Sequence, residues 1–303
     1  MDLQSLDDLI AVAESKSLSE AAIRRHVTQP AFTRRLQSIE KNLGIQVIRR
    51  GSKPARPSEA LLRNIDDIRS LAYSLRRLRH DLLDTASPDR VLTIAALHAI
   101  ALVHLPEALA RLNRILPLSR IRLHAANRDE CFTGLMTGQV RIMMVYETDL
   151  VRQPFNTELV ERAALCTERF IPVCAPDDEL TLSWLDPGAA SRTPLVGYPE
   201  GGVLGGILRS DIFPRSSASF SIVASTEFSS AVLELCERRL GVGWVPELLA
   251  AEKIASGRLR VVDDPANFPI VEMTVSMLRI HAGEQGYTDS AWTELQGIFS
   301  KQT

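Results

Sequence analysis

The chain has 303 residues, of which 45% are apolar and 24% charged, so it is long enough for two or three globular domains and has an ordinary soluble composition. Its net charge of -2 conceals an asymmetry, because residues 1–87 hold 15 basic and 11 acidic side chains and the rest of the chain is acidic. The start, MDLQSLDDLI, is unlike a signal peptide, and the longest apolar run, Val91–Leu105, is too short to cross a bilayer. We therefore expect a cytoplasmic protein with no membrane partner, in which the basic N-terminal segment binds nucleic acid.

Residues 17–44 predict a helix-turn-helix. Ser17 and Glu20 have the spacing of a capping box, which begins a short helix over Leu18–Arg25. After a turn, Thr28 caps a second helix with Pro30 in its first turn, where a missing N–H costs nothing. The predicted buried stripe of this second helix consists of Phe32, Leu36, Ile39 and Leu43.

The opposite face of the second helix has the chemistry of base recognition, because Gln pairs with adenine and Arg with guanine in the major groove. The predicted DNA contacts, to bases or to phosphates, are Thr28, Gln29, Pro30, Thr33, Arg34, Arg35 and Gln37. A basic amphipathic helix alone is more often a solvated surface. Here the cap, the turn, the proline and the basic face coincide, which predicts binding to double-stranded DNA.

Residues 45–57, IQVIRRGSKPARP, predict a β-wing around Gly51. Arg50, Lys53 and Arg56 would lie along phosphates or enter the minor groove. The alternative is a basic loop that only keeps the protein in solution.

Residues 58–84 predict one long helix with a coiled-coil repeat. The repeat places apolar side chains at alternating four- and three-residue steps: Leu61, Ile65, Ile68, Ala72, Leu75 and Leu82. Leu62, Leu71 and Leu78 broaden this stripe. A single helix cannot bury such a stripe, so we expect a homodimer that presents two recognition helices, with a hinge at residues 85–89.

Beyond the hinge, predicted strands and helices alternate, which indicates an α/β sheet. The predicted strands are 91–96, 121–126, 142–146, 195–198, 220–224, 242–245 and 271–278, and the predicted helices are 101–116, 128–137, 203–212, 227–239 and 289–299. Two lobes crossed by the chain near Thr167 and Asn267 would form a periplasmic-binding-protein-like fold. The predicted domains are a winged helix-turn-helix at 1–58, a linker helix and hinge at 59–87, and an effector domain at 88–303, with lobe I at 88–166 and 267–303 and lobe II at 167–266.

Ligands of open α/β sheets bind beyond the carboxyl ends of the strands. The residues at or just after these ends that we expect to contact a small polar or anionic effector are His98, Ala99, Ile100, Tyr146, Tyr198, Gly202 and Thr226. The segment 197–206 is rich in glycine but lacks the spacing and the lysine of a phosphate loop.

No catalytic signature, metal-ligand spacing or cofactor motif occurs, so we expect neither an enzyme nor a bound metal. An enzyme built on the two-lobed body stays a remote alternative. The four cysteines lack metal-binding spacing and are interpreted as reduced core residues: Cys131, Cys166, Cys174 and Cys236. The second alternative is a redox-responsive regulator that uses Cys or Met oxidation.

The segment Val27-Thr28-Gln29-Pro30-Ala31-Phe32-Thr33-Arg34, preceded by LDDLIAVAESKSLSEAA, resembles the recognition helix of LysR-type transcriptional regulators. The segments LTIA, FIPVCAP and GVGWVP resemble strands of that family's effector domain, and AALHAIALVHLPEAL is similar to the hypochlorite-responsive branch. The resemblance implies a homotetramer, an effector cleft between lobes, and contact with RNA polymerase as a further partner. The family often has Ser or Thr after its first strand. This chain has Leu97-His98-Ala99, so His98 either replaces that ligand contact or packs.

Overall fold

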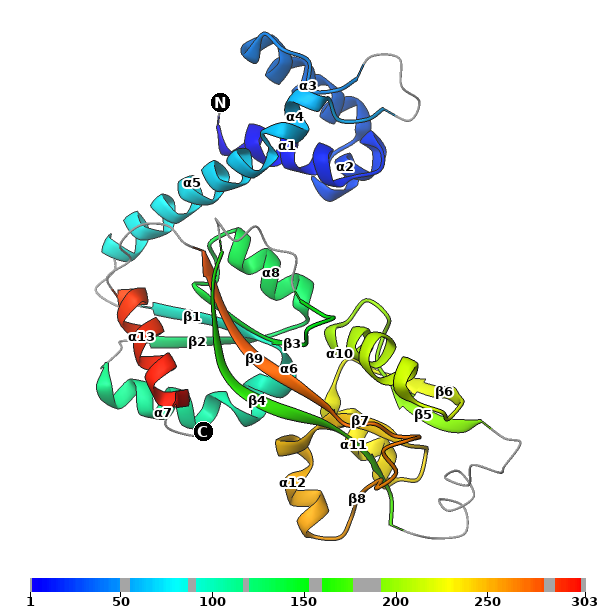
Figure 1. Cartoon of the computed structure of the whole chain (residues 1–303). Helices are drawn as coiled ribbons and strands as arrows, with labels where there is room; N and C mark the ends of the chain where they lie inside the picture. Colours follow the sequence, from blue (N-terminus) through cyan, green and yellow to red (C-terminus); the bar gives the residue numbers. More distant parts are fainter. Residues whose placement is uncertain are drawn as a thin grey trace. The chain divides into compact units, whose positions relative to one another are not determined.

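The computed structural model describes residues 2–49, 55–86, 91–116, 120–152, 160–176, 192–280 and 287–300. The chain divides into two compact units (Figure 1). One comprises Met1–Asp89 with the short segment Met136–Gln139, and the other Arg90–Leu135 with Val140–Thr303. Within the ranges given above, no helix is long and apolar enough to cross a membrane.

The first unit begins with three helices: α1 Leu3–Glu14, α2 Leu18–Arg24 and α3 Gln29–Leu43. The predicted cap of α2 is present, because the Ser17 hydroxyl accepts the Glu20 N–H at 3.2 Å. The Glu20 carboxylate accepts the N–H of Lys16 at 2.9 Å, one residue earlier than in a standard capping box. Thr28 takes the N-cap position of α3 through its backbone, without a side-chain capping bond. Gly44 ends α3 at a φ of 70°, which glycine adopts without steric cost.

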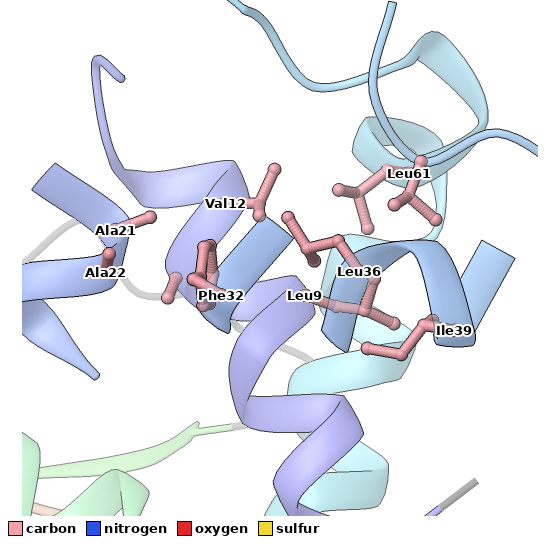
Figure 2. Packing of buried hydrophobic residues seen from close by; sticks show 10 residues of the cluster. Leu9, Val12, Ala21, Ala22, Phe32, Leu36, Ile39 and Leu61 are labelled. Carbon is pink, nitrogen blue, oxygen red and sulfur yellow. The ribbon is translucent and has the colours of Figure 1, made fainter. Parts of the chain in front are cut away.

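An apolar core joins these helices to the segments that follow them (Figure 2). Its members include Leu9, Val12, Ala21, Ala22, Phe32, Leu36, Ile39, Val47 and Leu61. Three of the four residues predicted for the stripe of α3 are buried here. Leu43 is 40% exposed, so its predicted place in the stripe is wrong: it is the last residue of α3, where the covering core has ended.

A short wing follows α3. Ile48 and Pro57 form an antiparallel bridge, and the Arg49 N–H donates to the Arg56 carbonyl at 2.9 Å. The two arms of the predicted wing therefore pair as expected. Its tip, residues 50–54, lies outside the described residues.

The single helix predicted over residues 58–84 is two helices, α4 Glu59–Arg63 and α5 Ile65–Ala86. The break occurs at Asn64, whose side-chain amide donates to the Ala60 carbonyl at 2.8 Å. Asn side chains compete with backbone groups for hydrogen bonds, which disfavours an uninterrupted helix at this point.

The apolar residues of the linker lie in two different environments. Leu61, Ile65 and Ile68 pack into or against the core of the first unit. A second set, spaced by four, three and four residues, is 38–64% exposed: Leu71, Leu75, Leu78 and Leu82. Ala72 is fully buried in the single chain as well. The predicted dimer seam is therefore wrong at Leu61, Ile65, Ile68 and Ala72, because periodicity shows that a face is apolar but not whether the same chain covers it.

The second unit contains a seven-stranded sheet with the order β2-β1-β3-β9-β4-β7 and with β8 beside β4. These strands are β1 Val91–Ala96, β2 Arg120–Ala125, β3 Ile142–Glu147, β4 Val160–Cys174, β7 Gly243–Pro246, β8 Arg260–Val261 and β9 Val271–Ile280. β1 is parallel to β2 and β3, whereas β9 is antiparallel to both β3 and β4. A smaller parallel sheet pairs β5 Thr193–Gly197 with β6 Phe220–Ser225.

Most helices of this unit lie between strands along the chain (Figure 1). They are α6 His98–Val103, α7 Leu105–Ile115, α8 Arg128–Met136, α10 Val203–Ile207, α11 Ser229–Glu237, α12 Glu247–Ala255 and α13 Tyr287–Ser300. A π-helical turn, Leu208–Ile212, continues α10. The predicted helix 101–116 is thus α6 and α7, which meet at His104.

Two long strands run through the sheet (Figure 1). β4 pairs with β9 from Val160 to Phe170, and it then pairs with β7 from Phe170 to Val173. Thr167, one predicted crossing point, lies inside β4, and Asn267 lies shortly before β9. A bulge between Ala164 and Cys166 shifts the register of β4 against β9.

Candidate DNA-binding surface and ligand pocket

The recognition surface is the outer face of α3. Gln29, Arg34 and Gln37 are exposed there, and Thr33 is partly exposed. The Gln29 side-chain oxygen accepts a hydrogen bond from the Ser19 hydroxyl at 3.0 Å, which orients the amide from the preceding helix. The Thr33 hydroxyl donates to the Gln29 carbonyl at 2.9 Å. Thr28 and Pro30 are exposed in the first turn, so the predicted face is assembled from one helix.

Arg35 lies differently from these neighbours. Its guanidinium is 3.7 Å from the carboxylate of Asp8, which belongs to α1 and is buried. On the wing, Arg56 is exposed, whereas Arg50 and Lys53 lie outside the described residues. The structure therefore brings the base-reading candidates together and gives Arg35 an intramolecular partner that the local pattern did not reveal.

A cavity of about 60 Å³ lies at the carboxyl ends of several strands of the second unit. At about 10–15 Å³ for each water molecule, it has room for about four to six waters or one small ligand. Five of the residues predicted for the effector site line it: His98, Ala99, Tyr146, Tyr198 and Gly202. Ile100 is buried outside its lining, and Thr226 instead accepts the Phe228 N–H at 3.2 Å.

The two tyrosines use their hydroxyls inside the protein. The Tyr146 hydroxyl donates to the Glu168 carboxylate at 2.8 Å. The Tyr198 hydroxyl is 2.9 Å from both the Ser229 hydroxyl and the Trp244 carbonyl. Burial raises the pKa of both tyrosines, so both stay neutral. With their hydroxyls bonded to protein, the two residues contribute largely aromatic surface to the pocket.

Polar groups of the lining come from segments that the sequence analysis did not assign to the site. Asn127 and Arg128 follow β2, and Glu227 and Ser229 follow β6. Asn127 accepts the Glu130 N–H at 3.0 Å, which caps the start of α8. Asn127 and Arg128 could have been predicted from their position, because they follow the carboxyl end of a strand next to β1, whose own carboxyl end was predicted to lie at the site.

A buried ionic cluster lies behind Tyr146. His104 Nε2 is 2.5 Å from the Glu168 carboxylate, and the second oxygen of Glu168 accepts the Leu248 N–H at 3.2 Å. Burial lowers the pKa of His104, but hydrogen bonds with Cys166 and Glu168 and the Glu168 charge outweigh it and raise this pKa to about 9. The imidazole is therefore protonated at neutral pH.

Comparisons with known proteins agree on one family. Residues 3–60 match the bacterial regulatory helix-turn-helix of the lysR family, and residues 85–282 match the LysR substrate binding domain. The chain belongs to the LysR family. It is a DNA-binding transcriptional regulator with an effector-binding domain. LysR regulators bind DNA and small-molecule effectors and oligomerise.

The HTH-type transcriptional regulator YjiE of Escherichia coli is 25% identical over 297 residues, which cover 97% of this chain and 93% of YjiE. Among solved structures, full-length HypT of Salmonella typhimurium, a hypochlorite-specific LysR regulator, has a TM-score of 0.55 at 22% identity and 99% coverage of both chains. Vibrio fischeri DarR in complex with DNA has a TM-score of 0.55 at 20% identity and 98% coverage of both. These two structures share the fold of this LysR chain.

The cysteines of this LysR protein fall into two groups. Cys131, Cys174 and Cys236 are buried, and burial raises the pKa of Cys131 and Cys236 to about 12. Such thiols are poor nucleophiles at neutral pH because their thiolate form is scarce. Cys166 is only partly buried and lies beside His104. In the part of the chain that the structure describes, no three His, Cys, Asp or Glu residues are grouped to hold a metal ion.

Proposed function

We propose that this LysR regulator reads its operator with Gln29, Thr33, Arg34 and Gln37 on the outer face of α3. The observation that carries the proposal is that these side chains share one accessible face of a helix whose opposite face is buried in the core. Gln and Arg are the side chains best suited to bidentate base contacts in the major groove. Backbone contacts are proposed for the first turn of α3 and for the wing: Thr28, Pro30, Arg50, Lys53 and Arg56.

A homodimer is proposed through the exposed leucines of α5, because a four-three-four spacing is the repeat that pairs helices. A homotetramer through the effector domains, contact with RNA polymerase and a cytoplasmic location are proposed from the family. The relatives named above are regulators, and we propose no catalytic role for this chain. The domain limits proposed from the sequence, 1–58, 59–87 and 88–303, also stand as a proposal.

We further propose that the effector is a small molecule with an apolar body and a polar or anionic head. The aromatic surfaces of Tyr146 and Tyr198 suit the body. Arg128 lies beside Asn127 at the start of α8; its Nε is hydrogen-bonded to Asp129 at 2.8 Å, and its remaining N–H groups offer the head a positive charge. A ligand at 100 times its Kd would stabilise the folded protein by about 2.7 kcal/mol. For a unit of this size that corresponds to a rise in melting temperature of about 5–10 °C.

The test measures melting of the full chain with a series of small carboxylic acids and their uncharged amides. A rise with an acid that exceeds the rise with its amide supports an anionic head. Gly202→Leu should abolish the rise, because it adds a side chain to the pocket lining where a Cβ meets only ordinary contact distances. The matched control is Gly201→Leu, whose Cβ would have no neighbour within 4 Å and which lies outside the lining. An unaltered rise in Gly202→Leu would refute this site.

An oxidant response at Cys166 is the second candidate function. It is favoured because Cys166 is the least buried of the four cysteines and lies beside His104. Four methionines are buried, Met143, Met144, Met273 and Met277, which favours the thiol over the thioether as the oxidised group. If hydrogen peroxide altered DNA affinity in the wild type and in Cys236→Ser but not in Cys166→Ser, this second function would replace ligand sensing.

A further inference from the structure

Two neighbouring carboxylates of α1, those of Asp7 and Asp8, form ion pairs with arginines from three other segments of the first unit. Asp8 accepts a hydrogen bond from Arg25 Nε at 2.8 Å and pairs with Arg35 at 3.7 Å. Asp7 pairs with Arg25 at 3.6 Å and is hydrogen-bonded to Arg76. Arg25 ends α2, Arg35 belongs to α3 and Arg76 belongs to α5.

Asp8 differs from Asp7 in burial and in partner. The Asp8 side chain is 1% exposed, whereas those of Arg25 and Arg35 are 26% and 35% exposed. A buried carboxylate requires charged or hydrogen-bonding partners, so Asp8 holds both arginines strongly. Both arginines retain an accessible edge, and Arg35 would reach solvent or DNA if the Asp8 carboxylate were removed, whereas Arg25 would keep Asp7 as a partner.

Arg35 lies at the border of the recognition surface. At 100° per residue it is about 60° around the helix from buried Phe32 and about 100° from exposed Arg34. From such a flank a flexible arginine can turn toward the DNA backbone. A contact with the DNA backbone raises the affinity for every DNA sequence and does not distinguish one sequence from another.

We infer that Asp8 is a positioning residue that sets sequence specificity: its buried carboxylate holds the guanidinium groups of Arg35 and Arg25 beside α3 and away from DNA phosphates. The inference rests on the proposed recognition surface of α3. If Asp8 acts in this way, Arg35 is not one of the phosphate contacts expected from the sequence. The ratio of specific to non-specific DNA affinity then depends on Asp8 in α1.

The experiment measures the binding of the full chain to a random-sequence 30-bp duplex over a range of salt concentrations. Each arginine released onto a phosphate makes the slope of log K against log salt steeper by about 0.9. Asp8→Asn should steepen the slope by about 0.9 through Arg35 and tighten binding to the random duplex, because Arg25 keeps its pair with Asp7. Asp8→Asn combined with Arg35→Gln should lose about 0.9 of this gain, and Asp8→Glu, which keeps the charge, should restore the wild-type slope.

The matched control is Asp7→Asn, which changes net charge equally on the same helix but removes a partner of Arg25 and Arg76 and leaves the pairs of Asp8 with Arg25 and Arg35 in place. Its slope should stay within about 0.3 of the wild type, since less than one phosphate contact is gained. Equal slopes in Asp7→Asn and Asp8→Asn would overturn the inference and reduce Asp8 to a structural residue.

Arg35→Gln in an otherwise unchanged chain tests the same inference without relying on the folding of Asp8→Asn. A slope flatter by about 0.9 would place Arg35 on a phosphate in the complex and overturn the inference. Arg34→Gln separates this failure from failure of the proposed surface. If Arg34→Gln bound every duplex as the wild type does, the assignment of α3 as the reading helix would be wrong.

Discussion

Among individual residues, Arg34 is the one most clearly expected to recognise a DNA base. It is exposed on the face of α3 opposite the core, and it has the side chain most often used to recognise guanine. Arg56 on the wing is also exposed, but from there it is expected to contact the backbone alone.

We predict that Arg34→Ala costs about 1–3 kcal/mol at one base position and relaxes specificity there. Arg56→Ala should instead weaken binding to all sequences and flatten the salt slope by about 0.9. The measurement is competition binding with an operator selected in vitro and with its single-base variants. Equal weakening of all variants by Arg34→Ala would contradict base reading.

His104 gives the molecule a defined dependence on pH. Its pKa in the folded protein, about 9, exceeds the unfolded value of 6.5, so the folded state binds the proton more tightly. The stabilisation is fully present below pH 6.5 and is lost as the pH rises through about 9. A shift of this size corresponds to a contribution on the order of 3 kcal/mol to the free energy of unfolding.

We therefore predict that the unfolding free energy, measured with urea, falls between pH 7 and pH 10. The fall should be smaller in His104→Gln, which cannot take up the proton. His124→Gln, which alters an exposed histidine of β2, serves as the control and should show the same fall in unfolding free energy as the wild type. The same pH profile in both variants would rule out His104 as its source.

Residue-level prediction from sequence worked where the chemistry is local. The Ser17–Glu20 cap and the buried positions Phe32 and Leu36 follow from spacing within one or two turns. The partner of Arg35 could not be predicted in this way, because Asp8 lies 27 positions away and reaches it only after three helices have packed. Arg128 was missed for a similar reason, since the end of β2 joins the pocket only once β2 has paired with β1.

At the scale of elements, α5 presents the clearest unpartnered surface of the first unit. Leu71, Leu75, Leu78 and Leu82 follow a heptad and are exposed within the described structure of the single chain. Ile68 packs on the core of the first unit, so a charge there would disturb folding as well as association.

We predict that Leu75→Lys with Leu82→Lys dissociates the dimer, because the seam would then bury like charges. Analytical ultracentrifugation of the full chain should show a lower association state, while circular dichroism keeps its helical signal. Leu62→Lys is the matched control, since Leu62 is 48% exposed but belongs to α4, off this heptad. An unchanged association state in the double variant would place the dimer contact elsewhere.

Some strands and helices were predicted within one residue of their observed bounds, and others were not. β1 has the predicted bounds, and α8 and β3 differ from theirs by one residue. The break at Asn64 depends on one side-chain hydrogen bond, and α12, Glu247–Ala255, was not predicted. β4 begins ten residues before the predicted segment at Phe170, because its mixed residues become a strand only through pairing with β9.

On the scale of the whole molecule, the basic front and acidic body agree with the division into two units. The helix-turn-helix motif and the alternation of strands and helices predicted a DNA-binding head and an α/β body, and the family resemblance implied that the body binds an effector. They could not give the order β2-β1-β3-β9-β4-β7, which depends on pairing between strands far apart in the chain. The pocket depends on that order, since its lining comes from the ends of strands that the chain reaches at different times.

The pairing of β9 with both β3 and β4 also affects how the protein folds during its synthesis on the ribosome. At about 5–20 residues per second, β9 leaves the ribosome about 5–20 s after β4, and during that interval both β3 and β4 lack their central partner. The helix-turn-helix core, made of contacts within the first 61 residues, is complete long before. A nascent chain would therefore already display its DNA-reading helix while two sheet edges are still open, which makes the effector domain the part most in need of a chaperone.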